Sequence, residues 1–374
     1  MGFLTEIRVR IGPFEQKLLA AIAKLGGGRN FHAHFDRSGT LDPEYLEGFD
    51  THPLEAASVM SLRRKQVLTG ELHRNCGYQD EENLEARIRE CLDDADAQGL
   101  IEAISCIDAT PDIGLTAIRV AARLREEYRG KVDFKIAAHP IFGFKDDPDH
   151  ESTRWDVFLE ACRIADIVGS LPEKDDRSDS IGYDEHLRRT LKLAITLRKP
   201  FHAHVDQSNL PTERGTLTLI QAVRWLGSPI LPDVSRADTH VPSVWAIHAI
   251  SPSSYPEELF REVIEGLVKH RIGVIVCPSA ALSMRQRHDV LVPMHNSIAR
   301  VLEMALAGVE IRIGTDNLAD VFVPTNVTLL GELMTLANAL RFYDIPVLAK
   351  MATGTKLNAT NKDAIRTHLE AARG

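Results

Sequence analysis

The sequence predicts an α/β protein of the (β/α)8 TIM-barrel class, and three observations lead to this prediction. Eight short apolar segments alternate with stretches whose apolar residues have helical spacing, and eight such units close a parallel sheet into a barrel. The length of 374 residues suits one barrel with insertions. No Gly-x-Gly-x-x-Gly fingerprint follows a predicted strand, which disfavours the open doubly wound sheet. We therefore expect residues 1–374 to form a single domain.

The elements of this barrel follow in order along the chain. Residues 1–28 form a helical lead-in, because apolar residues recur on one face before Gly26-Gly27-Gly28. Strands are predicted at 31–35, 101–107, 132–139, 164–169, 200–205, 243–248, 272–277 and 309–314. Helices are predicted at 83–98, 113–129, 152–162, 184–198, 213–226, 256–270, 297–307, 326–341 and 361–374. The segment between Asp36 and Asp80 reads as irregular and partly helical, with Arg63-Arg64-Lys65 on a solvated face.

The overall charge bears on the kind of partner. A net charge of −9 and a pI near 5.9 give no support to binding of nucleic acid or of an anionic membrane. No apolar run approaches the roughly 20 residues of a membrane span, and the N-terminus lacks a basic segment followed by an apolar one. We expect a cytoplasmic protein that acts on a small molecule, and a homo-oligomer.

The five cysteines are scattered and include no Cys-x-x-Cys pair. Neither a disulfide framework nor a thiolate zinc site is indicated. Any metal ion would therefore have to be held by histidine and aspartate.

Histidine and aspartate gather where the predicted strands end. His32 and His34 close the first strand with a spacing of two residues, which places both imidazoles on one face. Strands three, five, six and eight end in His139, in His202 and His204, in His248 and in Asp316. Barrel active sites lie at these strand ends, and a barrel rim needs no imidazoles to fold. The pattern predicts a metal site.

The donor set indicates the kind of metal chemistry. His32, His34, His204 and Asp316 would hold one divalent ion, with zinc favoured over iron or manganese. Such a site leaves a position for water, whose pKa the metal lowers. Asp316 would take the water's proton and return it to a leaving nitrogen, and His248 would polarise the attacked group's oxygen or hold the hydroxide. His202 shares a face with His204 and stays open as the alternative ligand.

These residues carry a resemblance to the amidohydrolase superfamily, within its cytosine-deaminase-like branch. The matching segments are His32-Ala33-His34-Phe35-Asp36, His204-Val205-Asp206-Gln207, His248 and Gly314-Thr315-Asp316-Asn317. The stretch from Asp316 to Pro324 also looks like that of triazine-degrading members such as N-isopropylammelide amidohydrolase. The resemblance runs from about residue 30 to 360. It implies a barrel with one divalent metal that activates water to break C–N bonds, and it favours His204 over His202.

Three departures from the family pattern narrow the expected activity. Only about thirty residues precede the first strand and no C-terminal strand is visible, so we expect no flanking β-sandwich. Gln207 stands where deaminases have a proton-shuttling glutamate, and an amide does not titrate; we expect Gln207 to orient substrate. Ile141 stands where they have a glutamine that contacts the pyrimidine. We therefore expect hydrolysis of a C–N bond in a small nitrogen-containing heterocycle other than cytosine.

Two alternatives remain open at this point. One is a ring-opening hydrolase of cyclic amides, and the other is a non-catalytic metal-binding barrel that has lost the proton shuttle. A binuclear site with a carboxylated lysine is not expected, because residues 164–170 include no lysine.

Several further residues receive provisional roles. The candidate substrate contacts are His202, Ile141, Asn317 and Arg285. Arg37 is expected to pair with Asp36 rather than with an anionic substrate. His139 is read as a surface or loop histidine.

Overall fold

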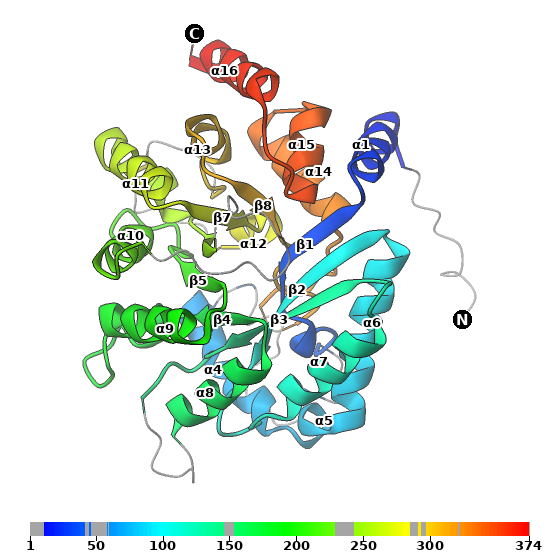
Figure 1. The fold of residues 1–374 in the computed structure, drawn as a ribbon, viewed down its shortest axis with the longest axis vertical. Coiled ribbons are helices and arrows are strands. Elements are labelled where there is room, and N and C mark those ends of the chain that lie inside the picture. The colour runs from blue at the N-terminus through cyan, green and yellow to red at the C-terminus, as the bar shows by residue number, and fades with distance from the viewer. Residues whose placement is uncertain are drawn as a thin grey trace.

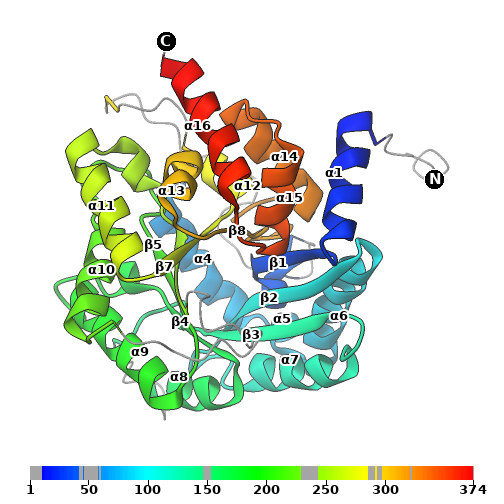
Figure 2. The ribbon, with the colours of Figure 1, turned by 45° about the horizontal axis from the view of Figure 1, so that its top comes forward.

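The structure, a computed structural model, describes residues 11–41, 45, 58, 60–145, 153–228, 243–284, 291–292, 297–320 and 322–373. In these ranges eight parallel strands, hydrogen-bonded in chain order, form a barrel with helices around it (Figures 1 and 2). The strands are β1 (Gly28–Ala33), β2 (Leu100–Asp108), β3 (Asp133–His139), β4 (Ile167–Ser170), β5 (Phe201–Val205), β6 (Val244–His248), β7 (Ile272–Val276) and β8 (Ile311–Ile313). The predicted fold class is confirmed, and every strand in the described ranges belongs to this sheet.

The barrel closes between its first and last strands. A parallel bridge joins Ala33 to Asp316, just beyond the end of β8. The amide of Asp316 donates to the carbonyl of His32 at 3.0 Å, and the amide of His34 donates to the carbonyl of Asp316 at 3.3 Å. The closing hydrogen bonds thus involve three of the residues that the sequence assigns to the metal.

The helices lie outside the sheet or over its carboxyl end. They are α1 (Pro13–Lys24), α4 (Leu62–Arg74), α5 (Cys76–Gln79), α6 (Glu81–Ala97), α7 (Thr116–Glu127), α8 (Arg154–Ile164), α9 (Tyr183–Leu197), α10 (Gly215–Trp225), α11 (Glu257–Lys269), α12 (Pro278–Leu282), α13 (Val301–Ala307), α14 (Leu329–Leu340), α15 (Ile345–Thr353) and α16 (Ala359–Arg373). Each predicted helix is present, with bounds that differ by a few residues. None of the described helices is long and apolar enough to cross a membrane.

Two local predictions need correction. β1 begins at Gly28 and ends at Ala33, so His34 follows the strand and precedes the short helix η1 (Phe35–Arg37). Helix α15 was not predicted, although Asp344 caps it by accepting from the amide of Val347 at 2.9 Å, a usual helix-start signal. α15 packs against α1 (Figure 1).

Apolar and aromatic side chains fill the barrel below its open end. They are Phe31, Ile104, Cys106, Ala137, Ile167, Trp245, Ile247 and Ile275. Arg312 of β8 also points inward, and its guanidinium lies 4.6 Å from the ring centre of Phe31 and 3.9 Å from that of Trp245. Because this layer is packed, a ligand can reach the strand ends only from the carboxyl side.

Candidate metal centre

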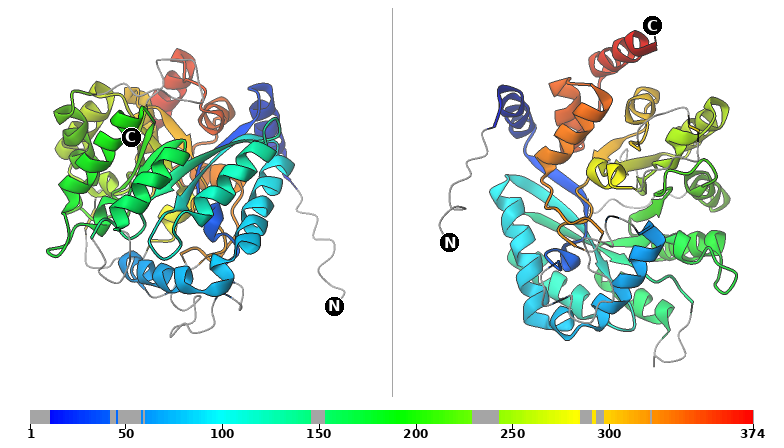
Figure 3. Two further views of the ribbon diagram at one scale, coloured as in Figure 1. Left: turned by 60° about the horizontal axis from the view of Figure 1, so that its bottom comes forward. Right: turned by 180° about the vertical axis from the view of Figure 1, so that it is seen from behind.

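A cavity of about 50 Å³ opens at the carboxyl ends of the strands. Its polar lining residues are His34, Arg37, Lys65, Gln66, His139, His204, Gln207, His248, Ser283, Asp316 and Asn317. Its apolar lining residues are Met60, Leu62, Ile141, Leu171, Ile250, Ala280, Met284, Phe322 and Val323. Helix α4 lies at this end of the barrel (Figure 3), and its residues Leu62, Lys65 and Gln66 line the cavity. The cavity thus combines apolar walls with a cluster of imidazoles, as small-molecule sites do.

His34 and Asp316 line this cavity, and the buried His32 converges with them on one point beside it. The Nε2 atoms of His32 and His34 each lie 3.3 Å from Oδ1 of Asp316. Donors bound tetrahedrally at 2.0–2.1 Å are about 3.3 Å apart. Both nitrogen-to-oxygen distances therefore already match the spacing of donors in a zinc-like coordination shell.

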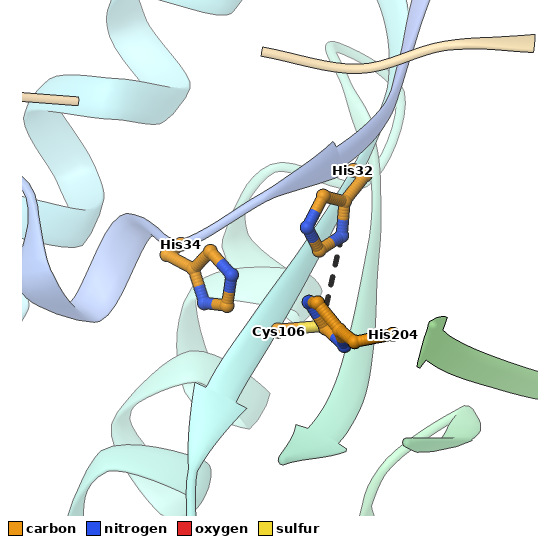
Figure 4. Close-up of side chains that lie close together, drawn as sticks. All are labelled: His32, His34, Cys106 and His204. Carbon is orange, nitrogen blue, oxygen red and sulfur yellow. Dashed lines mark hydrogen bonds between the residues drawn. The ribbon is translucent and has the colours of Figure 1, made fainter. Parts of the chain in front are cut away.

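His204 and His248 complete the cluster. The ring centres of His32 and His204 are 4.8 Å apart, and those of His204 and His248 are 5.4 Å apart. Nδ1 of His204 donates to the carbonyl of Ser170 at 3.4 Å, so Nε2 carries the lone pair. That Nε2 and the Nε2 of His248 have no hydrogen-bond partner among the described residues. Figure 4 shows the imidazoles of His32, His34 and His204 close together at the strand ends.

Burial sets the charge of these groups. It lowers the pKa of His34 and of His204 well below the usual value, and the pKa of His248 to about 4. Burial alone would raise the pKa of Asp316, but the facing His32 and His34 bring it well below its ordinary range. At neutral pH His34, His204 and His248 are therefore neutral and Asp316 is ionised. Neutral imidazoles and an ionised carboxylate are the forms that bind a divalent metal. The buried Nε2 atoms of His204 and His248, which have no partner in the described part of the chain, also fit a metal site.

The backbone at two site residues is strained. His248 has a φ of 76° and Asp316 a φ of 61°, a region that costs a residue with a Cβ about 1–3 kcal/mol. For Asp316 the hydrogen bonds to His32 and from His34 hold this conformation. Strain of this kind is typical of functional sites.

Gly314 is required for the approach of β8 to His32. A Cβ at Gly314 would lie 2.6 Å from Cβ of His32 and 2.7 Å from its carbonyl oxygen. Any other residue there would push the end of β8 away from β1. The glycine in the Gly-Thr-Asp-Asn segment therefore has a steric role in bringing Asp316 to the histidines.

His139 was read from the sequence as a surface or loop histidine, and that interpretation is wrong. It is 1% exposed and its ring centre lies 5.1 Å from that of His34 and 4.8 Å from that of His204. Nδ1 of His139 lies 2.8 Å from Oδ1 of Asp108. Its Nε2 has no partner among the described residues.

Asp108 is the centre of a buried charge network that fixes His139. It binds Nη1 of Arg37 at 2.9 Å and Nε2 of His73 at 3.1 Å. Burial opposes ionisation of Asp108, but Arg37, His139 and His73 bring its pKa well below the usual value. An ionised Asp108 accepts the Nδ1 proton of His139, so the lone pair of Nε2 faces the cavity.

The predicted pairing of Arg37 with Asp36 is also wrong. The guanidinium of Arg37 binds Asp108, and it donates to Oδ1 of Asn317 at 3.0 Å. A further ion pair, at 3.6 Å, reaches Asp320. Arg37 thus joins β1, β2 and the segment after β8 instead of pairing with its neighbour in sequence.

Lys65 does not lie on a solvated face as predicted. It is 5% exposed and its Nζ donates to the carbonyl of Phe322 at 3.0 Å. This contact ties α4 to the segment after β8. The sequence missed it because residues 36–80 have no clear periodicity.

The remaining predicted site residues fall into three groups. Gln207, Ile141 and Asn317 line the cavity with His248 and Asp316, and Nε2 of Gln207 has no partner among the described residues. His202 points into the barrel one layer below His204, 6.4 Å from Trp245 between ring centres, and does not line the cavity. Arg285 lies outside the described residues.

Comparison with known proteins adds information on the fold. No protein-family model matches the chain. An uncharacterized protein of Haemophilus influenzae is 26% identical over 298 residues, which is 80% of this chain and 97% of that protein.

Several solved structures have a similar fold although their sequence identity to the chain is low. The 5-methylcytosine deaminase of Klebsiella pneumoniae, liganded with 5-fluorocytosine, matches with a TM-score of 0.72 at 18% identity, over 91% of this chain and 74% of that one. The N-isopropylammelide isopropylaminohydrolase of Burkholderia multivorans matches with a TM-score of 0.61 at 17% identity, over 91% and 82%. A zinc-containing amidohydrolase from Burkhoderia ambifaria matches with a TM-score of 0.53 at 12% identity, over 98% and 94%. The chain thus has the barrel fold of these amidohydrolases, in agreement with the resemblance noted in its sequence.

Proposed function

We propose that this protein is a metal-dependent hydrolase of a C–N bond in a small, nitrogen-containing heterocycle. The convergence of two imidazole nitrogens on Asp316, each at 3.3 Å, carries the proposal. The proteins that share the fold support it, since their names include a deaminase and an isopropylaminohydrolase.

One divalent metal ion would be held by His32, His34, His204 and Asp316. Imidazole and carboxylate donors in this number suit zinc, and one amidohydrolase of the same fold holds zinc. When bound, such an ion supplies a water of lowered pKa as the nucleophile. His204 is preferred to His202 because it has a donor atom within 4.8 Å of donor atoms of His32 and His34.

Asp316 and His248 are the groups that would handle protons and developing charge. Asp316 directs Oδ1 at the histidines, so its second oxygen can take a proton from water and pass it to the leaving nitrogen. His248 is buried and neutral, and its Nε2 has no hydrogen-bond partner within the described ranges. In the tautomer with a proton on Nε2, it donates a hydrogen bond to the oxygen that forms at the attacked carbon.

Other residues that line the cavity would position the substrate. The lone pair of His139 Nε2 can accept an N–H of a ring, and the free amide of Gln207 can donate to a ring nitrogen or carbonyl. Ile141, Leu171 and Phe322 provide apolar surface for a planar ring. Cytosine is not proposed, because Gln207 cannot carry a proton to the ring nitrogen.

The test is a substrate panel with zinc-loaded protein, and Asp316→Asn is the matched control. The panel contains amino-substituted pyrimidines, purines and triazines, and ammonia or amine release is measured. We expect release with at least one ring, lost in Asp316→Asn. Absence of any C–N hydrolysis in a zinc-binding protein would favour the non-catalytic metal-binding barrel and contradict the proposal.

Ring-opening hydrolysis of a cyclic amide is the second candidate, and Gln207 favours it. Opening a cyclic amide requires a proton only on the leaving nitrogen, which Asp316 can supply. Hydantoins and dihydropyrimidines in the same panel distinguish the two reactions. Ring opening gives a new carboxylate without ammonia, whereas deamination releases ammonia.

A further inference from the structure

The second nitrogen of His32 has an unusual partner. Nδ1 of His32 lies 3.7 Å from Sγ of Cys106, on β2 (Figure 4). Cys106 is fully buried and its thiol is free. The sulfur therefore contacts the nitrogen that faces away from Asp316, while Nε2 of the same ring faces Asp316.

The proposed ligand histidines differ in the hydrogen-bond partner of Nδ1, the nitrogen that would not bind the metal. Nδ1 of His204 donates to the carbonyl of Ser170, whereas Nδ1 of His34 has no partner in the described part of the chain. A histidine that binds metal through Nε2 carries its proton on Nδ1, and the group that accepts this proton fixes the ring. For His32 that group is a sulfur atom.

We propose that Cys106 is a positioning residue of the metal centre, whose thiol accepts the Nδ1 proton of His32 and thereby orients Nε2 toward the ion. The inference rests on the proposed function, because it takes His32 as a metal ligand. Carboxylates and carbonyls are the usual acceptors in this role. Here the acceptor is a weak one on a small apolar side chain. This suits Cys106, which belongs to the apolar cluster of Ile104 and Ala137.

A direct bond from Cys106 to the ion is the competing arrangement. Sγ lies within 4.8 Å of a nitrogen of His32, of His34 and of His204. The sulfur nevertheless contacts Nδ1 of His32, whereas Nε2 of that ring contacts Asp316. The geometry points to an outer role for the sulfur, and a cobalt spectrum separates the two cases.

The experiment measures zinc and cobalt binding to the reduced full-length protein and three variants. Cys106→Ala removes the acceptor, Cys106→Ser replaces it with a hydroxyl, and Cys162→Ala is the control, since Cys162 is an equally buried thiol in α8. Zinc affinity is measured by competition with a chelating indicator, and circular dichroism checks the fold. We expect a loss of about 10- to 100-fold in Cys106→Ala, a smaller loss in Cys106→Ser and no change in Cys162→Ala.

Each other outcome has a definite meaning. Wild-type zinc affinity in a folded Cys106→Ala variant would overturn the inference and leave the proposed function intact. A thiolate-to-cobalt charge-transfer band that is present in wild type and absent in Cys106→Ala would make Cys106 a ligand and overturn the positioning role. A wild-type protein that binds neither zinc nor cobalt would overturn the proposed function, and this inference with it.

Discussion

Asp316 contacts His32 through both its main chain and its side chain. Its amide donates to the carbonyl of His32 at 3.0 Å, and its Oδ1 lies 3.3 Å from Nε2 of the same residue. The hydrogen bond that closes the barrel therefore also sets the distance between two proposed metal ligands. Stability of the barrel closure and metal affinity should change together when this contact is disturbed.

Gly314→Ala tests this coupling. The added Cβ would overlap Cβ and the carbonyl oxygen of His32, and overpacking of this kind costs about 1–3 kcal/mol. We expect a lower free energy of unfolding and weaker zinc binding, measured by urea denaturation and chelator competition. Gly70→Ala is the control, because Gly70 lies in α4 and its nearest neighbour would be 3.5 Å away. Unchanged zinc affinity in Gly314→Ala would show that barrel closure and zinc binding are not coupled.

Arg37→Met tests the charge network around Asp108. The substitution leaves a buried carboxylate without its guanidinium, and breaking such a pair costs about 3–5 kcal/mol. We expect that loss in urea denaturation, and partial recovery in the double variant Arg37→Met with Asp108→Asn. The single variant Asp108→Asn is measured as well. If the two single variants' losses in free energy of unfolding add up to the loss in the double variant, the two residues are not coupled.

The strand-end histidines could be predicted from the sequence because barrel topology brings all strand ends to one rim. The same rule places His139 at the end of β3, and it would also place Asp108 at the end of β2. Their role was missed because their pairing depends on the register between β2 and β3, which the sequence pattern does not specify. The contacts of Arg37 with Asp108 and Asn317 join residues 71 and 280 positions apart, and no local pattern encodes such contacts.

Glu332, which is not a proposed metal ligand, is expected to make the stability of the fold depend on pH. Burial raises its pKa from 4.5 to about 8, while the amide of Ser279 donates to its Oε2 at 2.9 Å. The folded state therefore holds a proton that the unfolded state releases above pH 4.5, so this stabilising contribution is present below pH 4.5 and is lost as pH rises through about 8.

Glu332→Gln removes this titration. The difference between the free energies of unfolding of the variant and of wild type should change by about 1.4 kcal/mol per pH unit. Between pH 5 and pH 7.5 it should therefore shift by about 3 kcal/mol in favour of the variant. Urea denaturation at both pH values measures the difference, with the exposed Glu262→Gln as control. Parallel pH profiles for Glu332→Gln and wild type would show that Glu332 is ionised in the fold.

The number of zinc ions retained per chain after gel filtration tests the central claim most directly, measured on wild type, His204→Asn and His202→Asn. Both histidines are on β5, but only His204 belongs to the cluster with His32 and His34. The account predicts one zinc ion in wild type, about one in His202→Asn and nearly none in His204→Asn. No zinc in wild type, two zinc ions in wild type, or a loss confined to His202→Asn would contradict it.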